Sequence, residues 1–144
     1  MKFDILTLFP ESLDSYFNSS ILKRAQENKL ISIDMHDIRE QTTDKRRTVD
    51  DTPYGGGPGM VIQIEPVYKT LKKVYKRKSK NTRVILMSPQ GKSLDQNEVK
   101  RLSKYKRLIL IAGHYEAIDA RIDNFIDEKI SLGNFVLTGG ELAA

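Results

Sequence analysis

Arg83-Val-Ile-Leu-Met87 is the first of three apolar runs that decide the fold of this chain. The second is Arg107-Leu-Ile-Leu-Ile-Ala112, and the third is a shorter run near Glu128–Ser131. Unbroken apolar runs of this length are typical of strands that are buried on both faces, as in a parallel sheet. They predict an α/β fold built on a mainly parallel sheet with helices on both faces.

A loop of small and polar residues follows each predicted strand. The loops are Ser88–Gly91, Gly113–Asp119 and Leu132–Glu141, and all three contain glycine. In open parallel sheets, ligands bind at the carboxyl ends of the strands. Glycine lets backbone N–H and C=O groups approach a ligand closely. The loops therefore predict one shared site for a flat ligand.

The composition is that of a single globular domain, which we expect to span residues 1–144. Hydrophobic residues make up 39% of the chain and charged residues 30%, the usual proportions for such a domain. The absence of cysteine excludes disulfides and thiolate metal sites, and two histidines are too few for a His-rich one. No run approaches the roughly 18 apolar residues of a membrane span, and the first residues lack an export cleavage pattern. We expect a cytoplasmic protein without a bound metal or a membrane partner.

The amino-terminal part predicts a β-α-β unit. Lys2–Phe9 has the apolar content of a strand, which Pro10 ends. Apolar residues then recur at helical spacing and predict one amphipathic helix over about 12–27, with Asn28 as its stop. Leu30–Asp37 alternates as a second strand. The two strands are expected to be parallel, with a right-handed crossover.

A long polar stretch, Ile38 to about Gly59, separates this unit from the next helix. It ends in Pro53-Tyr54-Gly55-Gly56-Gly57-Pro58-Gly59, which makes regular structure improbable. Such a loop is either disordered or functional. The residue types in this stretch favour a functional loop. Arg46 and Arg47 can hold phosphate, and Asp50 and Asp51 can order the loop. The glycines let the backbone approach a ligand.

The charge is unevenly placed. The net charge is +5, with eight basic residues and no acid between Lys69 and Arg83, against six acids and two bases from Leu108 to Ala144. This asymmetry predicts either a face that meets a polyanion or a solvated helix face.

The helix that carries the first lysines is expected to begin at Glu65-Pro66. Its buried face is formed by Val67, Leu71, Val74 and Tyr75.

The segment after the first apolar run resembles the end of a phosphate-binding loop, Gly91-Lys92-Ser93. The pattern also needs a glycine five residues earlier, where this chain has Leu86, so we reject an ATP or GTP loop. Asp95 and Glu98 instead predict a capping box for a helix over about 96–105, with Leu94 and Val99 as its hydrophobic staple. A short helix is expected over Asp119–Phe125, and another begins near Gly139.

These segments, taken together, resemble the amino-terminal domain of the bacterial tRNA (guanine-N1)-methyltransferases, a trefoil-knot (SPOUT) methyltransferase family. The segments lie in the family's order along nearly the whole chain. They are Leu8–Glu11, Arg47–Asp51, Pro53–Met60, Ser88–Gly91, Gly113–Glu116 and Gly133–Leu142. The chain departs from the family at three positions. Family members often have arginine at the position of His114, glycine at that of Ala117 and proline at that of Ala143.

The resemblance implies a knotted α/β domain, S-adenosylmethionine as methyl donor, tRNA as substrate and a homodimer. Carried over by motif, Gly113 and the segment Leu132–Leu137 would hold the donor largely through backbone groups, while Pro89 and Tyr115 would line its pocket. The donor-binding residues implied are Pro89, Gly113, Tyr115, Leu132, Gly133, Asn134, Phe135, Val136 and Leu137. For Gly113 and Gly133, simple turn geometry is the alternative.

Methyl transfer to guanine N1 requires that this nitrogen lose its proton, and a nearby carboxylate can accept it. Glu116 is the catalytic candidate in this chain, and its alternative role is to order the loop. The resemblance places the family's proposed catalytic aspartate and an essential arginine beyond Ala144, so we expect this chain alone not to methylate tRNA. The competing functions are a non-catalytic RNA-binding module and a nucleotide-binding protein that uses Gly55–Gly59 as its phosphate cradle.

Overall fold

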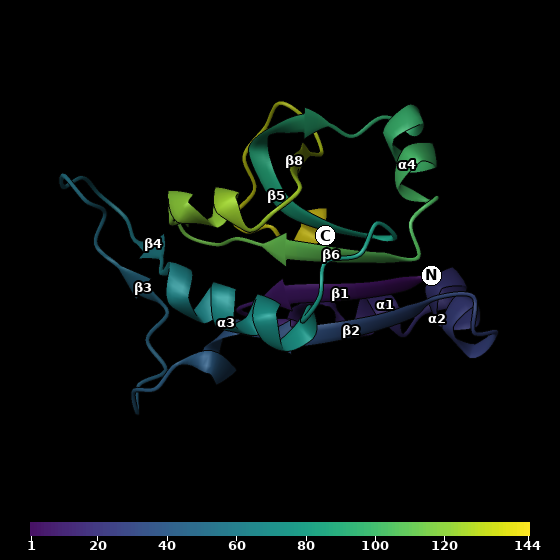
Figure 1. Cartoon of the computed structure of the whole chain (residues 1–144), viewed down its shortest axis with the longest axis horizontal. Helices are drawn as coiled ribbons and strands as arrows, with labels where there is room; N and C mark the ends of the chain where they lie inside the picture. The colour runs from purple at the N-terminus through teal and green to yellow at the C-terminus, as the bar shows by residue number, and fades with distance from the viewer.

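A five-stranded parallel sheet forms the centre of the computed structural model, which describes residues 1–144 (Figure 1). The strands lie in the order β2-β1-β6-β5-β8, and every neighbouring pair is parallel. Their bounds are Lys2–Thr7 for β1, Ser32–Asp37 for β2, Thr82–Ser93 for β5, Arg107–Ala112 for β6 and Glu128–Ser131 for β8. The predicted parallel sheet and its three carboxyl-terminal strands are therefore confirmed.

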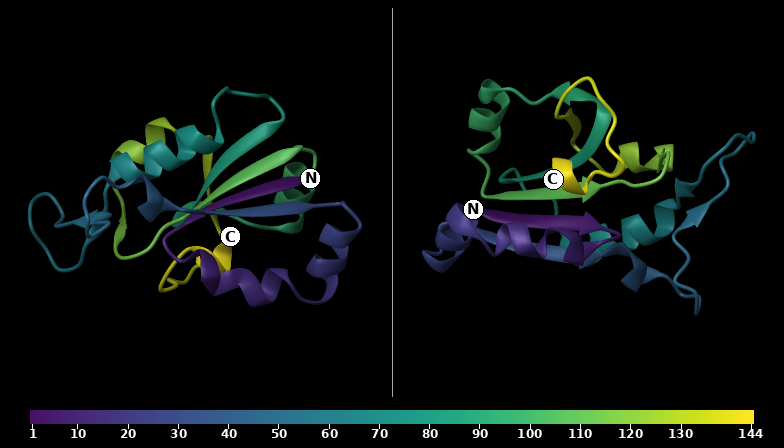
Figure 2. Two further views of the ribbon diagram at one scale, coloured as in Figure 1. Left: turned by 90° about the horizontal axis from the view of Figure 1, so that it is seen from below. Right: turned by 180° about the vertical axis from the view of Figure 1, so that it is seen from behind.

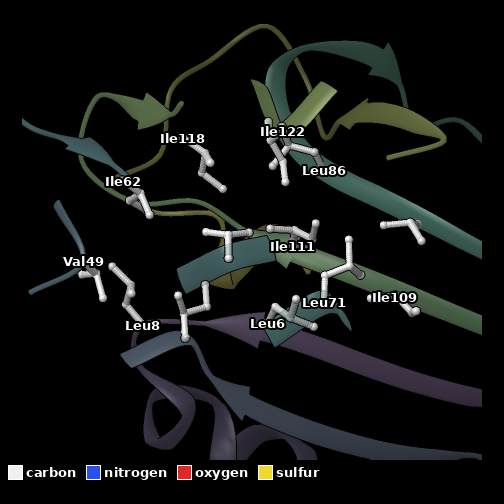
Figure 3. Close-up of a cluster of buried hydrophobic side chains, with 13 residues drawn as sticks. Leu6, Leu8, Val49, Ile62, Leu71, Leu86, Ile109, Ile111, Ile118 and Ile122 are labelled. Carbon is white, nitrogen blue, oxygen red and sulfur yellow. The ribbon is translucent and has the colours of Figure 1, made fainter. Parts of the chain in front are cut away.

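Apolar side chains of the central strands point alternately to the two faces of the sheet. Leu6, Ile109 and Ile111 join the core on one face (Figure 3), and Ile5, Leu108 and Leu110 join the core on the other. Helix α3 (Ile64–Val74) covers the first face, and α4 (Gln96–Leu102) lies over the second. Figure 2 shows the sheet between these two layers. Burial on both faces explains why the strands are unbroken apolar runs.

The helix predicted over 12–27 is wrong as a single element. The chain instead forms a 3₁₀ turn η1 (Pro10–Leu13), a short helix α1 (Asp14–Phe17) and a helix α2 (Ser20–Glu27). The break falls where side chains compete for backbone carbonyls: Asn18 donates to the carbonyl of Asp14, and Ser19 donates to that of Tyr16. Ser20, the first residue of α2, then has a positive φ of 46°, which the interior of a continuous α-helix does not allow.

Helix boundaries also differ from the sequence prediction. Helix α3 begins at Ile64, so Pro66 is its third residue, still within the first turn, where no intrahelical donor is needed. Helix α4 ends at Leu102 rather than Tyr105. Half of its capping box forms, with the Asp95 carboxylate accepting from the backbone N–H of Glu98 at 2.8 Å. The Glu98 carboxylate does not return the bond, because it pairs with Lys92 and Arg101.

The polar stretch is partly structured and joins a second, smaller sheet. It contains the 3₁₀ turn η2 (Ile38–Gln41) and the short strand β3 (Asp50–Asp51), which is antiparallel to β4 (Val61–Ile62). Strand β4 in turn runs parallel to β7 (Ala117–Ile118). Two further 3₁₀ turns, η3 (Ala120–Asn124) and η4 (Glu141–Ala143), complete the chain. None of the helices has the length and apolar character needed to cross a membrane.

A buried carboxylate ties three strands together within the sheet. Asp4 of β1 is fully buried, and its oxygens lie 2.8 Å from His36 Nε2 on β2 and 2.6 Å from Arg107 Nε on β6. Burial alone would raise the pKa of the Asp4 carboxyl, but the hydrogen bonds from His36 and Arg107 outweigh it and lower this pKa to about 2. The ionised form is therefore part of the native structure.

Asp4→Asn is expected to destabilise the fold by about 3 kcal/mol, because it leaves the Arg107 guanidinium without its charged partner. Since the pKa of Asp4 is depressed in the folded state, its stabilisation is present above pH ~4 and is lost as the pH falls toward ~2. Urea unfolding at pH 7 and at pH 3 measures both effects. Asp34→Asn, at a half-exposed carboxylate that pairs with Lys2, is the control. Equal stability of the Asp4 and Asp34 variants at pH 7 would contradict this account.

Candidate functional site

A cavity of about 380 Å³ opens at the carboxyl ends of β5, β6 and β8. The predicted loops after these strands all contribute to its wall. They supply Ser88, Pro89 and Gln90 from the first, Gly113–Ile118 from the second, and Leu132, Gly133 and Phe135–Gly140 from the third. The volume is that of a site for a drug-sized organic molecule. The sequence-based expectation that the three loops meet is therefore confirmed.

The structure places almost every predicted site residue at this cavity. Pro89, Gly113, Tyr115, Glu116, Leu132, Gly133, Phe135, Val136 and Leu137 line it, whereas Asn134 does not. Sequence reasoning missed the wall formed by η3, where Ala120, Ile122 and Asp123 face the cavity, and also missed Lys129 of β8. No local motif marks these residues, because they reach the site only through the packing of η3 beside the sheet.

The first wall is a bent strand rather than the predicted free loop. Strand β5 continues through Ser88–Gly91 to Ser93, and Ile130 of β8 pairs with both Met87 and Lys92, so the intervening residues bulge. A Cβ at Gly91 would lie 2.5 Å from the backbone nitrogen of Ile130. The bulge therefore depends on glycine at this position, because a backbone atom cannot move aside cheaply.

Gly113 differs from the other glycines at the site. A Cβ there would meet only Ile118, at an ordinary 3.5 Å, and its φ lies outside the left-handed region. Neither turn geometry nor packing within the chain therefore demands glycine at position 113. A Cβ at Gly140, in contrast, would lie 2.9 Å from Ala112 Cα and from the Gly113 backbone nitrogen. Gly140 is needed for packing, whereas Gly113 keeps space open in the cavity.

The third wall presents free backbone groups. Residues 134–137 make no backbone hydrogen bond within the chain. The apolar side chains beside them are unusually exposed, with Phe135 at 54% and Val136 at 83%. A Cβ at Gly133 would collide with the Phe135 ring at 2.5 Å, so the space beside Gly133 is filled by that ring rather than left open. Unpaired donors and acceptors suit a flat ligand with a polar edge.

A buried polar cluster lies next to His114 of the cavity wall. The Glu141 carboxylate accepts a hydrogen bond of 2.8 Å from the Thr7 hydroxyl, and both residues are buried. His114 Nδ1 lies 3.6 Å from the same carboxylate, is shielded from solvent and has no hydrogen-bond partner. The Gly140 N–H donates to the Gly113 carbonyl at 2.7 Å, which fixes the third loop against the second.

Glu116 lies where the cavity meets the small sheet. Its backbone N–H donates to the Met60 carbonyl at 3.1 Å, and its side chain packs against Gly59, whose φ of +86° and close approach exclude a Cβ. Its carboxylate makes no hydrogen bond or ion pair within the chain. The backbone of Glu116 thus holds the loop, while its carboxylate is left available at the cavity.

Comparison with known proteins agrees with this geometry. The family model described as tRNA (Guanine-1)-methyltransferase TrmD matches residues 1–144. The chain belongs to this family. It is 50% identical to the tRNA (guanine-N(1)-)-methyltransferase of Ruminiclostridium cellulolyticum, 48% identical to that of Dehalococcoides mccartyi strain BAV1, and 50% identical to that of Chloroflexus aurantiacus, each over 145 residues.

These relatives are longer than the chain. All of this chain aligns with each of them, but it covers only 62%, 58% and 57% of their respective lengths. The parallel sheet described above fits the knotted α/β fold of the family. Family membership thus covers the cavity and its three walls, and roughly two fifths of each relative lies outside the part that is compared.

Gly140→Ala is expected to destabilise the chain by about 2 kcal/mol, because the added methyl group meets backbone atoms of Ala112 and Gly113. Gly113→Ala, one hydrogen bond away, is expected to change stability by less than about 0.5 kcal/mol, because its methyl group has room. Thermal unfolding of the two variants provides the comparison. If Gly113→Ala is the more destabilising of the two, position 113 is a packing position and not an open one.

Proposed function

We propose that this chain is the donor-binding domain of an enzyme that transfers a methyl group from S-adenosylmethionine to N1 of the tRNA guanosine on the 3′ side of the anticodon. The observation that carries the proposal is the cavity where three loops converge, in a chain of the tRNA (Guanine-1)-methyltransferase family. The enzyme would act on tRNA in the cytoplasm, as a homodimer, with residues 1–144 as a single methyltransferase domain. The exposed apolar side chains of Val136 and Leu142 support further association.

The residues at the cavity fit the donor. Backbone groups of Leu132, Gly133 and residues 134–137 would hold its adenine edge. Those of residues 134–137 make no hydrogen bond within the chain, whereas the Gly133 N–H and C=O already share the Ser131 hydroxyl. Gly113 leaves room for the amino-acid portion, since no side chain fills the space there. Pro89 and Tyr115 would cover the remaining apolar surface. The bound donor supplies an activated methyl group on a sulfonium, so the chain's task is to position it.

Glu116 is the residue of this chain that could act on guanine N1, the methyl acceptor. Guanine N1 carries a proton that must leave before the nitrogen can form a bond to carbon. The Glu116 carboxylate lines the cavity and is unpaired, so it can hold this edge of the base or accept its proton. The competing function as a nucleotide-binding protein is less well supported. Gly55–Gly59 does not line the cavity, which argues against a phosphate cradle there.

Isothermal titration calorimetry with S-adenosylmethionine and S-adenosylhomocysteine tests the donor site directly. We expect both to bind, and we expect Gly133→Val to weaken them at least tenfold, because the valine would drive the Phe135 ring out of its position. A circular dichroism spectrum confirms that the variant is folded. Tighter binding of ATP than of either donor compound would reject the proposal. Methyl transfer is then assayed with a chain extended to the length of its relatives.

The basic segment from Lys69 to Arg83 is less uniform in the structure than in the sequence. Lys69 pairs with Glu65, Lys73 with Glu40 and Arg83 with Glu128, whereas Lys72 and Lys76 have no acidic partner. Only the unpaired cations are free to displace the counterions of an RNA phosphate without losing an internal ion pair. The segment therefore supports RNA binding at part of its length.

Lys72→Gln combined with Lys76→Gln is expected to reduce the slope of log affinity for tRNA against log salt by about 1.5, the contribution of two phosphate contacts. Lys69→Gln combined with Lys73→Gln is the matched control, because those lysines already have partners. Fluorescence anisotropy at several salt concentrations gives the slopes. Identical slopes for the wild type and the Lys72/Lys76 variant would show that this face is merely solvated.

A further inference from the structure

Glu141 is a buried carboxylate beside the donor cavity. The Thr7 hydroxyl donates to one of its oxygens, Oε1, at 2.8 Å. The Thr7 oxygen itself accepts from the Phe9 N–H at 3.0 Å, so the direction of both bonds is fixed and the hydroxyl hydrogen points at Glu141. Because Oε1 is already an acceptor, a proton shared by this carboxylate lies on the side of its second oxygen, Oε2.

His114 faces that second oxygen. Its Nδ1 lies 3.6 Å from Glu141 Oε2 and is shielded from solvent without a hydrogen-bond partner. A Cβ at Gly139 would collide with both of these atoms, so glycine at this position is what lets the two groups face each other. The backbones of His114 and Gly139 also form an isolated antiparallel bridge, which holds the two loops together.

Two aromatic rings hold the imidazole in this orientation. Phe9 and Tyr115 both meet it edge to face, with centroids 4.9 Å and 5.2 Å away. A lone pair on Nδ1 would face the lone pairs of an ionised carboxylate, so Nδ1 carries a proton. The other ring nitrogen, Nε2, is not shielded in this way, and His114 lines the cavity. A proton that His114 gains or loses is therefore exchanged at Nε2.

The pair formed by Glu141 and His114 has two charge states near neutral pH. When Nε2 is bare, the imidazole is neutral and the carboxylate gives the pair a net negative charge. When Nε2 is protonated, the two charges cancel. Histidine ordinarily makes this change between about pH 5 and 8. The pair thus places a negative charge at the wall of the donor site that a proton can remove.

The other charged groups around the pair make no hydrogen bond or ion pair with it. They are Glu116, Asp123 and Lys129 at the cavity, Glu11 on η1, which packs against η4, and Arg39 beside the Phe9 ring. Asp123 and Lys129 pair with each other at 2.8 Å. None of these groups is a histidine, so the change of charge near neutral pH belongs to His114.

We propose that the pair of Glu141 and His114 sets the preference of the cavity for the methyl donor over its demethylated product. This proposal rests on the proposed function. S-adenosylmethionine carries a positive sulfonium, whereas the sulfur of S-adenosylhomocysteine is neutral. A net negative pair attracts the sulfonium, and burial limits the screening of that attraction by salt. The product gains nothing from the same charge, so the pair favours exchange of product for donor.

Calorimetric titration of the chain with both compounds tests this preference. Between about pH 8 and about pH 5.5 we expect the ratio of donor affinity to product affinity to fall about fivefold, as Nε2 takes up a proton. The ratio cancels the titration of groups that the two compounds share, and it cancels any effect of pH on the loops that weakens both alike.

Two variants are expected to shift the ratio in opposite directions at low pH. His114→Gln keeps an N–H donor for Glu141 but cannot be protonated, so the ratio should stay at its high value at both pH values. Glu141→Gln removes the negative charge and is expected to lower the ratio about fivefold at pH ~8. Loss of a merely structural contact would weaken both compounds equally and leave the ratio unchanged, which would overturn the proposal.

Glu116→Gln is the matched control. It removes an unpaired carboxylate from the same cavity and leaves the pair intact. We therefore expect it to lower the ratio by the same factor at both pH values and to retain the pH dependence of the wild type. A pH dependence that disappears in this variant would assign the effect to Glu116 and overturn the role of the pair. Circular dichroism shows whether each variant is folded, and the wild-type measurements stand without them.

The chain without donor gives an independent test. Nitrogen NMR spectroscopy of the imidazoles is expected to show a proton on His114 Nδ1 throughout and titration at Nε2. The chain has two histidines, so the spectrum of His114→Gln assigns the signals. A neutral His114 with its proton on Nε2 would overturn the proposal. A chain that binds both compounds with a ratio independent of pH refutes the pair alone, whereas a chain that binds neither rejects the proposed function and this proposal with it.

Discussion

The in-register parallel pairing of β1, β5 and β6 is the constraint on which the rest of the structure depends. Thr82 of β5 lies opposite Arg107 of β6 and Met87 opposite Ala112, so the bulge of β5 begins at the level where β6 ends. Because both faces of these strands are buried, a slip of one residue would exchange the two cores and bury different side chains. This register brings the bulge of β5 and the loop after β6 to one point, and β8 adds the third loop there.

The sheet fixes the positions of the cavity walls, and the loops leave the cavity open. Gly91 and Gly140 are fixed by backbone atoms of neighbouring strands, so they set where the walls stand. Gly113 and residues 134–137 contribute in the opposite way, by leaving space and hydrogen-bonding groups unused within the chain. A rigid frame with unsatisfied groups at one edge is what a pre-formed ligand site requires.

The sheet and most of the cavity could be predicted from the sequence, because the signals for them lie in short continuous segments. Continuous apolar runs identify strands that are buried on both faces, and the glycine-bearing loops follow them directly, so Gly113 and Phe135 were placed without a structure. The break at Asn18–Ser20 was missed because apolar periodicity continues across it, while the side-chain bonds that cause it depend on geometry. The bulge at Gly91, the wall of η3 and the space filled by the Phe135 ring were missed because each depends on contacts between distant segments.

The hydrogen bond between Thr7 and Glu141 joins residues 134 positions apart in the sequence. A chain that emerges from the ribosome at about 5–20 residues per second can pair β1 with β2 early, but this hydrogen bond cannot form until Glu141 has been made. The Thr7 hydroxyl oxygen can accept from the Phe9 N–H as soon as both residues are made, but the hydroxyl has no carboxylate to donate to until Glu141 follows. The link between the first strand of the sheet and η4 is thus acquired only after the residues between Thr7 and Glu141 have all been synthesised.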